Sequence, residues 1–241
     1  MANAKSASGY YYKLAVYHYK TAAQETRLDT YFQQAYLPAL HRAGFKQIGV
    51  FKPVEQDTAD KKIYVLIPAS SWDKLKDVDE KLSSDNTYTS AAADYTDALY
   101  NNAPYDRIET ILLKAFTKMP VPAIPNLNGD KNERVYELRS YESATEKQHI
   151  NKVKMFNDGN EVALFNRLGF NAVFYGDVIA GGHMPNLMYM TTFNNKADRD
   201  KHWDAFGSDA EWKELSARPE YQHNVSKNTI VFLRPAQYSD F

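Results

Sequence analysis

A duplicated sequence pattern constrains the fold of this chain more than any other feature. The first copy reads RAGF at residues 42–45 and the second reads RLGF at residues 167–170, an offset of 167 − 42 = 125. Each copy ends an amphipathic run and begins an apolar one. Glycine suits the position just past a helix end, because it enters the left-handed backbone region without steric cost. The pattern therefore predicts two long helices, each followed directly by a β-strand.

Further matches extend this repeat over most of the chain. Tyr12 matches Tyr136, and the T-x-x-Q motif at Thr21 matches that at Thr145, in both cases at an offset of 136 − 12 = 145 − 21 = 124. T-x-x-Q is the capping-box pattern, which satisfies free amides at a helix start. SDNTY at 84–88 matches SDAEW at 208–212, again at 124, so one residue is gained within the long helix and lost later. The chain thus contains two copies of a unit of roughly 105–110 residues.

Apolar periodicity gives the order of elements in each copy. For the first copy we expect strands at 10–19, 45–52, 62–67 and 107–116, helices at 22–43 and 71–83, and partial helix at 86–103. For the second we expect strands at 134–141, 170–176, 187–193 and 228–234, helices at 145–168 and 197–206, and a stretch without an assigned form at 209–221. Pro38 predicts a kink in the first helix, because proline removes one helical hydrogen bond. Both copies follow the ferredoxin-like order β-α-β-β-α-β.

The predicted fold class is therefore α+β, with two tandem ferredoxin-like units and antiparallel sheets. We expect residues 1–9 to lack regular structure, 10–118 to form the first domain, the proline-rich residues 119–132 to be a linker, and 133–241 to form the second domain. Strands 107–116 and 228–234 are apolar on both faces, so the sheet face without helices needs a cover. A like sheet is the natural cover. We expect the two sheets to pack face to face as in a dimeric α+β barrel, and the chain to form a homodimer.

Composition excludes several classes of function. The chain has no cysteine, which excludes disulfides, thiol catalysis and cysteine-ligated metals. Its net charge of −1 gives no field that would attract nucleic acid, and its longest apolar runs are far short of a membrane span. The six histidines show no metal-binding spacing, and we expect neither a metal nor another cofactor. Ala2–Asn3–Ala4 resembles the end of a secretory signal, so a periplasmic or exported location and a cytoplasmic one both stay open.

Four patterns of the second copy point to a known family, namely YELRSYE at 136–142, the long helix that ends in RLGF, MYMTTF at 188–193 and SDAEW at 208–212. In these patterns the sequence resembles the NIPSNAP family. The first half, from YKLAVYHY to YLPALHRAGF, resembles a more diverged second copy. The resemblance implies the dimeric α+β barrel fold, and it implies no settled reaction. Relatives with this fold include cofactor-independent monooxygenases and small-molecule isomerases, so the resemblance implies a ligand cavity between sheet and helices.

The first strand of the second copy holds the main candidate for a binding site. Glu137, Arg139 and Tyr141 share one face of that strand, because side chains alternate along a strand. If the opposite face meets the helices, these three side chains line the space between the sheets. They would then either position a polar ligand or pair with one another as a structural network. The first copy has Lys13 and Ala15 at the matching places, so we expect no duplicate of this site.

Three further residues are candidates for ligand contacts. His18 and its neighbour Tyr17 lie on the first strand, where His18 is either a general base in a cavity or a histidine satisfied within the core. His183 lies in the loop GGHMP, where it either covers a cavity mouth or is a solvated turn residue.

These observations leave two hypotheses from different classes. The first is a small-molecule-binding or scaffold module, because no convergent catalytic set is visible in the sequence. The second is a cofactor-independent monooxygenase or isomerase that acts in the cavity between sheet and helices, and it depends on likeness of fold alone. A closed pocket, and the polar groups that converge in it, would discriminate between them.

Overall fold

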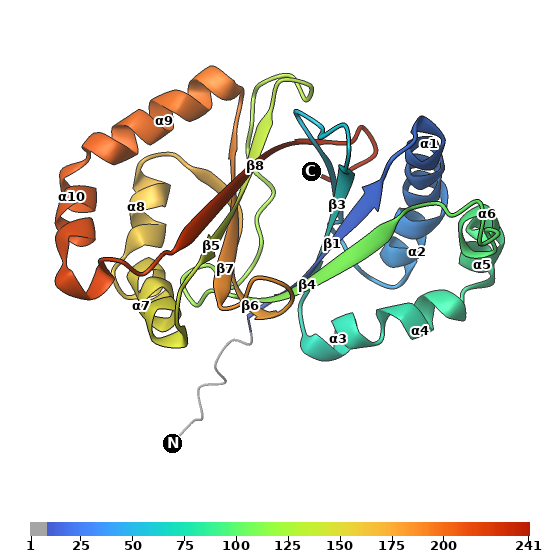
Figure 1. Cartoon of the computed structure of the whole chain (residues 1–241), viewed down its shortest axis with the longest axis horizontal. Helices are drawn as coiled ribbons and strands as arrows, with labels where there is room; N and C mark the ends of the chain where they lie inside the picture. Colours follow the sequence, from blue (N-terminus) through green and yellow to red (C-terminus); the bar gives the residue numbers. More distant parts are fainter. Residues whose placement is uncertain (1–8) are drawn as a thin grey trace. The chain divides into compact units, whose positions relative to one another are not determined.

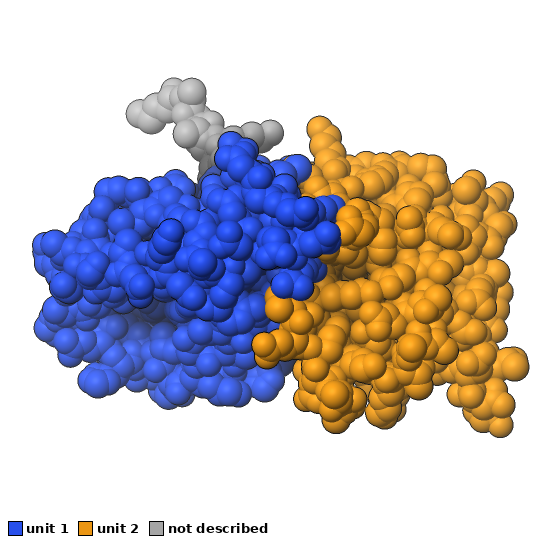
Figure 2. All heavy atoms as spheres, turned by 90° about the horizontal axis from the view of Figure 1, so that it is seen from above, with its two compact units in different colours: residues 1–10, 111–234 blue, residues 11–110, 235–241 orange. Residues whose placement is uncertain are grey.

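The computed structural model of the protein describes residues 9–241 (Figure 1). The Ala2–Asn3–Ala4 motif and nearly all of the predicted irregular segment 1–9 lie outside the described residues. The chain divides into two compact units, coloured separately in Figure 2. Unit 2 contains Tyr11–Thr110 and Pro235–Phe241, and unit 1 contains Ile111–Arg234 together with the stretch that ends at Tyr10.

Unit 2 contains the elements of the first copy in the predicted order. Its strands are β1 (Tyr11–Tyr19), β2 (Gly49–Pro53), β3 (Lys61–Ala69) and the start of β4 (Arg107–Ala115). Its helices are α1 (Ala22–Tyr31), the π-helix η1 (Phe32–Tyr36), α2 (Leu37–Arg42), α3 (Trp72–Lys76), α4 (Val78–Ser83), α5 (Asn86–Ala91) and α6 (Ala93–Thr96). Figure 1 shows these helices on one face of the strands of the unit.

Unit 1 contains the second copy. Its strands are β5 (Val135–Glu142), β6 (Asn171–Ala180), β7 (Asn186–Phe193), most of β8 (Lys227–Pro235) and the end of β4. Its helices are α7 (Glu146–Asn157), α8 (Glu161–Arg167), α9 (Lys196–Ser208), α10 (Ala210–Ala217) and the short 3₁₀ helix η2 (Pro219–Tyr221). A cluster of buried aromatic side chains, among them Phe156, Phe165 and Tyr189, forms its core.

Strand pairing confirms the predicted fold class. In the second copy β5 pairs with β7 and β8, and β7 also pairs with β6, all antiparallel. In the first copy β3 pairs antiparallel with β1 and β2. Within unit 2 the strand order is β1-β3-β2, and within unit 1 it is β8-β5-β7-β6-β4, so each unit contains an antiparallel sheet.

The compact units do not coincide with the repeat boundaries in the sequence. The unit boundary falls within β4, between Thr110 and Ile111, because Leu112–Ala115 pair with β6. The C-terminal residues 235–241 belong to unit 2, where the Ala236 amide donates a hydrogen bond to the Val50 carbonyl. Residues 119–132 lie in unit 1, so the division of the chain into two domains joined by this linker stays a prediction.

Local sequence signals explain where the long helices begin and end. The Thr21 hydroxyl accepts a hydrogen bond from the Gln24 amide, and the Gln24 side chain bonds back, which completes a capping box. The Thr145 hydroxyl accepts from the Gln148 amide at the matching place. Gly44 and Gly169 have φ of +86° and +77°, which confirms their predicted left-handed role after the helices. In the first helix a π-helical segment, η1, directly precedes the turn that holds Pro38.

Within residues 9–241 no helix combines the length and the apolar character that a membrane span requires.

Candidate functional site

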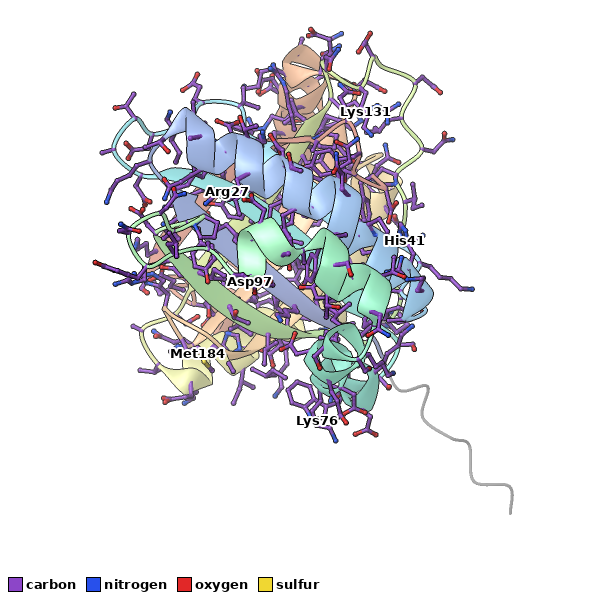
Figure 3. All side chains as sticks on the ribbon, turned by 90° about the vertical axis from the view of Figure 1, so that its right-hand side faces the viewer. Arg27, His41, Lys76, Asp97, Lys131 and Met184 are labelled. Atoms are coloured by element: carbon purple, nitrogen blue, oxygen red, sulfur yellow. The ribbon has the colours of Figure 1, made fainter. Side chains whose placement is uncertain are left out.

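A pocket of about 650 Å³ lies within unit 2, between strands β1 and β4 and the helices that cover them. Its floor comes from alternate residues of β1, namely Lys13, Ala15 and Tyr17. The remaining lining residues, which come from the helices, from β4 and from the end of α6, are Tyr31, Tyr36, Asp79, Leu82, Ser83, Tyr88, Thr89, Thr96, Asp97, Ile108 and Thr110. Figure 3 faces this side of the unit and labels Asp97.

Stacked tyrosine rings form the apolar wall of the pocket. The Tyr31 ring stacks on that of Tyr95, with centroids 3.7 Å apart and planes 6° apart, and it also stacks on Tyr36 at 5.3 Å. The hydroxyls of Tyr31 and Tyr88 are 2.9 Å apart and hydrogen-bonded. Tyr17 packs edge-on against Phe32 at 4.9 Å. Ring contacts of this kind hold the wall in one shape.

The hydroxyls of these tyrosines stay protonated at physiological pH. Burial raises the pKa of Tyr17 and of Tyr31 well above the ordinary tyrosine value, and the neighbouring tyrosines raise it further. Burial and the Asp79 carboxylate raise the pKa of Tyr36 in the same direction. The pocket therefore presents neutral hydroxyls that donate or accept hydrogen bonds, and it holds no tyrosinate base.

Lys13 is the most enclosed charge of the pocket. Its side chain is 19% exposed, and its Nζ lies 3.8 Å from a carboxylate oxygen of Asp79, whose side chain is 78% exposed. Asp97, the other acidic residue of the lining, is also exposed. The interior of the pocket thus carries a positive charge, and the acidic groups lie at its rim in contact with water.

The matching region of unit 1 is filled by its own side chains. Arg139, at the place of Ala15, donates from Nε to a Glu137 oxygen at 2.6 Å, and its guanidinium carbon lies 3.6 Å from the centre of the Trp203 ring. Arg199 of α9 donates to both Glu137 oxygens, at 2.7 and 2.9 Å, and the Trp203 indole donates to one of them at 2.9 Å. Glu137 is fully buried and its carboxylate is fully satisfied. Burial alone would raise the pKa of Glu137, but Arg199 and Arg139 outweigh burial and lower it.

A second polar group lies beside the first. The Arg139 guanidinium donates to the Tyr141 hydroxyl at 3.0 Å, and that hydroxyl is 2.8 Å from the Tyr189 hydroxyl. Lys152 and Glu161, both buried, form an ion pair at 2.9 Å. Burial raises the pKa of Glu161, although the Lys152 ammonium acts in the opposite direction.

One prediction about the second copy is therefore wrong. The face of β5 that carries Glu137, Arg139 and Tyr141 does not line a space between sheets; it meets the helices of unit 1, where α9 supplies Arg199 and Trp203. The physical reason is that α9 provides both the countercharge and the ring on which a desolvated guanidinium is stable. The alternative of a structural network describes the contacts of this group, and the ligand role of Glu137, Arg139 and Tyr141 stays a prediction.

The other predicted residues divide between the pocket and the surface. Tyr17 lines the pocket. His18 points to the opposite face of β1, where its Nδ1 is 2.7 Å from an Asp60 oxygen and its Nε2 is 3.7 Å from Glu109. The His183 side chain is 69% exposed in a loop, which agrees with a solvated turn residue.

Sequence reasoning missed Tyr31, Tyr36 and Tyr88 as lining residues. Tyr31 and Tyr36 recur at helical spacing within the first long helix, which is typical of core residues, and both are buried. The signal that could have identified the pocket was Ala15, because a small residue at the place of Arg139 leaves a volume that no neighbour fills.

Across residues 9–241 the structure brings together no group of three or more histidine, aspartate and glutamate side chains that could hold a metal ion.

Comparisons with known proteins agree with this architecture. The NIPSNAP family model matches residues 136–240. No curated protein sequence matches the chain. The solved structures described next have low sequence identity to this chain, so their likeness shows the fold alone.

Three solved structures are similar to nearly the whole chain. A provisionally assigned monooxygenase from Fusobacterium nucleatum has a TM-score of 0.58 and 6% identity, over 95% of this chain and 93% of that one. A provisionally assigned monooxygenase from Lactobacillus acidophilus has a TM-score of 0.56 and 12% identity, over 94% of each chain. An anthrone oxidase-like protein has a TM-score of 0.54 and 8% identity, over 96% of this chain and 93% of that one.

Proposed function

From the premise that the second half of this chain is a NIPSNAP domain, we propose that the protein binds a small molecule in the pocket of unit 2. In this proposal the two halves have separate roles. The first half holds the ligand, and the second half has its matching region closed by its own side chains.

The difference between the two halves at one position is the observation that carries the proposal. Ala15 and Arg139 are equivalent in the repeat, since 139 − 15 = 124. In unit 1 the arginine fills the region between sheet and helices. In unit 2 the alanine leaves a pocket of about 650 Å³, which lies within the range of small-molecule sites.

The lining indicates the chemistry of the ligand. Tyr17, Tyr31, Tyr36 and Tyr88 line the same volume. Ring faces favour a planar, largely apolar body, and neutral hydroxyls hydrogen-bond polar atoms at its edge. We therefore propose an aromatic ligand with at least one oxygen-bearing substituent.

A cofactor-independent monooxygenase or isomerase acting in the same pocket is a second candidate. It is favoured by the likeness of fold to two chains that carry a provisional monooxygenase assignment and to an anthrone oxidase-like protein. The pocket lining holds Lys13, Asp79 and Asp97 as its ionisable groups besides tyrosine, and its tyrosines are held neutral. Oxygen consumption in the presence of a bound phenol separates the monooxygenase from binding alone, and chromatographic detection of an isomeric product separates the isomerase from it.

The proposal is tested by filling the pocket. We expect 2-naphthol to bind the native protein, as measured by calorimetry, and Ala15→Leu to weaken that binding by roughly tenfold or more, because the added side chain occupies the ligand volume. Ala91→Leu is the matched control, since Ala91 is exposed on α5 and does not line the pocket.

Two results would overturn the proposal. One is a native protein that binds none of a panel of one-ring to three-ring aromatic compounds. The other is binding that is equally strong in Ala15→Leu and in the control, which would place the ligand elsewhere. Thermal unfolding of both variants establishes that each has folded before binding is compared.

A further inference from the structure

We infer that the ligand of the unit 2 pocket is an aromatic carboxylate, whose acidic group binds Lys13 and whose ring lies against the tyrosines. This inference rests on the proposed function and deepens it, because it assigns the charge and the chemical class of the ligand.

The first step is the state of Lys13. Its side chain is mostly enclosed, yet among the described residues its single ion-pair partner is Asp79, with a carboxylate oxygen 3.8 Å from Nζ. That distance is beyond a hydrogen bond, so the ammonium donates none to this partner. An enclosed ammonium with three free donors is an incomplete arrangement, and an anionic ligand group would complete it.

The second step is a reversal of charge between the two halves. Lys13 is equivalent to Glu137, since 137 − 13 = 124. In unit 1 the acid at this place binds the cationic side chain of Arg139, which occupies the central volume. In unit 2 the base at this place faces the same volume, which Ala15 leaves open. If the occupant complements the strand residue in both halves, then the occupant in unit 2 is an anion.

The third step concerns the acidic groups of the pocket. Asp79 and Asp97 would oppose an anion, but both are exposed to water. The field of an exposed charge is screened by solvent and salt, whereas that of an enclosed charge such as Lys13 is screened much less. Asp79 is therefore suited to pair with Lys13 while the pocket is empty and to be replaced by a ligand carboxylate.

The fourth step is the hydrogen-bonding capacity of the wall. Tyr31, Tyr36 and Tyr88 line the pocket with neutral hydroxyls. Because the Tyr31 and Tyr88 hydroxyls bond each other, one of that pair, together with Tyr36, can donate a hydrogen bond to a carboxylate oxygen. A carboxylate conjugated to a planar ring would thus meet Lys13 and hydroxyl donors at its charged end. Its ring would lie against the stacked rings at the other end.

Three probes of the same shape and different charge test the inference. They are 2-naphthoate, 2-naphthamide and protonated 2-naphthamidine, each titrated at neutral pH in low and in high salt. We expect naphthoate to bind roughly tenfold more tightly than the neutral amide, with the amidine weakest, and we expect high salt to reduce the difference.

Substitution of Lys13 assigns the preference to that side chain. We expect Lys13→Gln to remove the preference for naphthoate and Lys13→Glu, which copies the second half, to make the amidine the tightest probe. Lys46→Gln is the matched control, because Lys46 is exposed and outside the pocket lining. Binding of neutral 2-naphthol to each variant shows that its pocket has folded.

The outcomes separate the inference from the proposed function. If 2-naphthol binds in an Ala15→Leu-sensitive manner but the amide or the amidine binds the native protein most tightly, the inference is overturned and the proposed function stands. A preference for naphthoate that survives in Lys13→Gln also overturns the inference. If none of the four compounds binds, the inference is overturned, and if the whole panel of one-ring to three-ring aromatic compounds also fails to bind, the proposed function is overturned with it.

Discussion

At the scale of single residues, the side chain at one strand position decides whether a half has a pocket or a polar network. Ala15 leaves volume over β1, and Arg139 fills the same place over β5. The arginine is tolerated because Glu137 neutralises it and Trp203 covers it, so that its desolvation is offset by hydrogen bonds and ring contact.

Glu137→Gln is expected to destabilise the protein by about 3–5 kcal/mol at neutral pH, because it leaves two guanidinium groups around a neutral amide. Both Arg139 and Arg199 bond the Glu137 carboxylate in the native protein. Chemical denaturation measures the loss. Asp200→Asn is the control, since Asp200 bonds Arg199 from the exposed side and its removal should change stability much less.

The same variant has a predicted pH dependence. The pKa of Glu137 is lowered in the folded protein, so its contribution to stability is complete above the pKa of the unfolded chain and is lost as pH falls through the folded pKa. The difference in unfolding free energy between native protein and Glu137→Gln should therefore shrink as pH falls below about 4.3. A difference that stays constant down to the acid limit of folding would contradict this assignment.

The sequence allowed part of this site to be predicted. Alternation along the strands correctly placed Lys13, Ala15 and Tyr17 on one face, and Glu137 with Arg139 on the equivalent face. It could not indicate which face meets the helices, because a charged strand face looks like a solvent or cavity face until its partners are known. Those partners, Arg199 and Trp203, are about sixty residues away in the sequence and carry no local signal of the pairing.

At the scale of elements, the long helix of each copy is interrupted at the same place in different ways. The first copy has the π-helical segment η1, and the second has a break between α7 and α8 around Asn160, which has a φ of 70°. The additional residue of the second copy, visible as the change of offset from 124 to 125, falls in this region. The weak points at Pro38 and at 157–160 were predictable from composition, whereas the π-helical form was not, because it depends on how the turn packs.

The buried Lys152–Glu161 pair joins α7 to α8 and provides a test at this scale. The equivalent residues of the first copy are Leu28 and Tyr36, since 152 − 28 = 124 before the additional residue and 161 − 36 = 125 after it. Leu28 and Tyr36 are buried and uncharged, so the fold does not require an ion pair here. We expect Lys152→Met and Glu161→Met each to cost about 3–5 kcal/mol, and the double variant to be close to native stability.

A double-mutant cycle in denaturant measures this coupling. The exposed pair Arg218–Glu214 on α10 is the control and should show coupling near zero. Additive losses in the buried pair would mean that each charge is stabilised by groups other than its partner, and this would contradict the assignment.

At the scale of the whole molecule, duplication explains the fold and divergence explains the site. The order of elements followed from the repeat, because each copy has the same capping and apolar pattern. Antiparallel sheets were expected in both halves, but the register of their strand pairs could not be read from local pattern. The homodimer stays a prediction.

The chain's last residues complete the unit that its first half begins. The Ser239 hydroxyl accepts a hydrogen bond from the Val50 amide at 3.0 Å, and the Asp240 carboxylate accepts one from the Ile48 amide at 2.7 Å. Phe241 is buried against Phe51, with ring centroids 5.8 Å apart. Although the repeat assigns this segment to the second copy, its interactions belong to the first unit.

Removal of residues 238–241 should therefore destabilise the first half of the chain and not the second. Amides of Ile48 and Val50 would lose their acceptors, and Phe51 would lose a packing partner, so we expect faster hydrogen exchange at Ile48, Val50 and the β2 amides that follow, and unchanged exchange in β5. Phe241→Ala alone should cost about 3–5 kcal/mol, as for other buried phenylalanines. Tyr100→Ala is the control, because that side chain is almost fully exposed. Unchanged hydrogen exchange in β2 after truncation would contradict this prediction, because it would show that β2 is stable without the C-terminal segment.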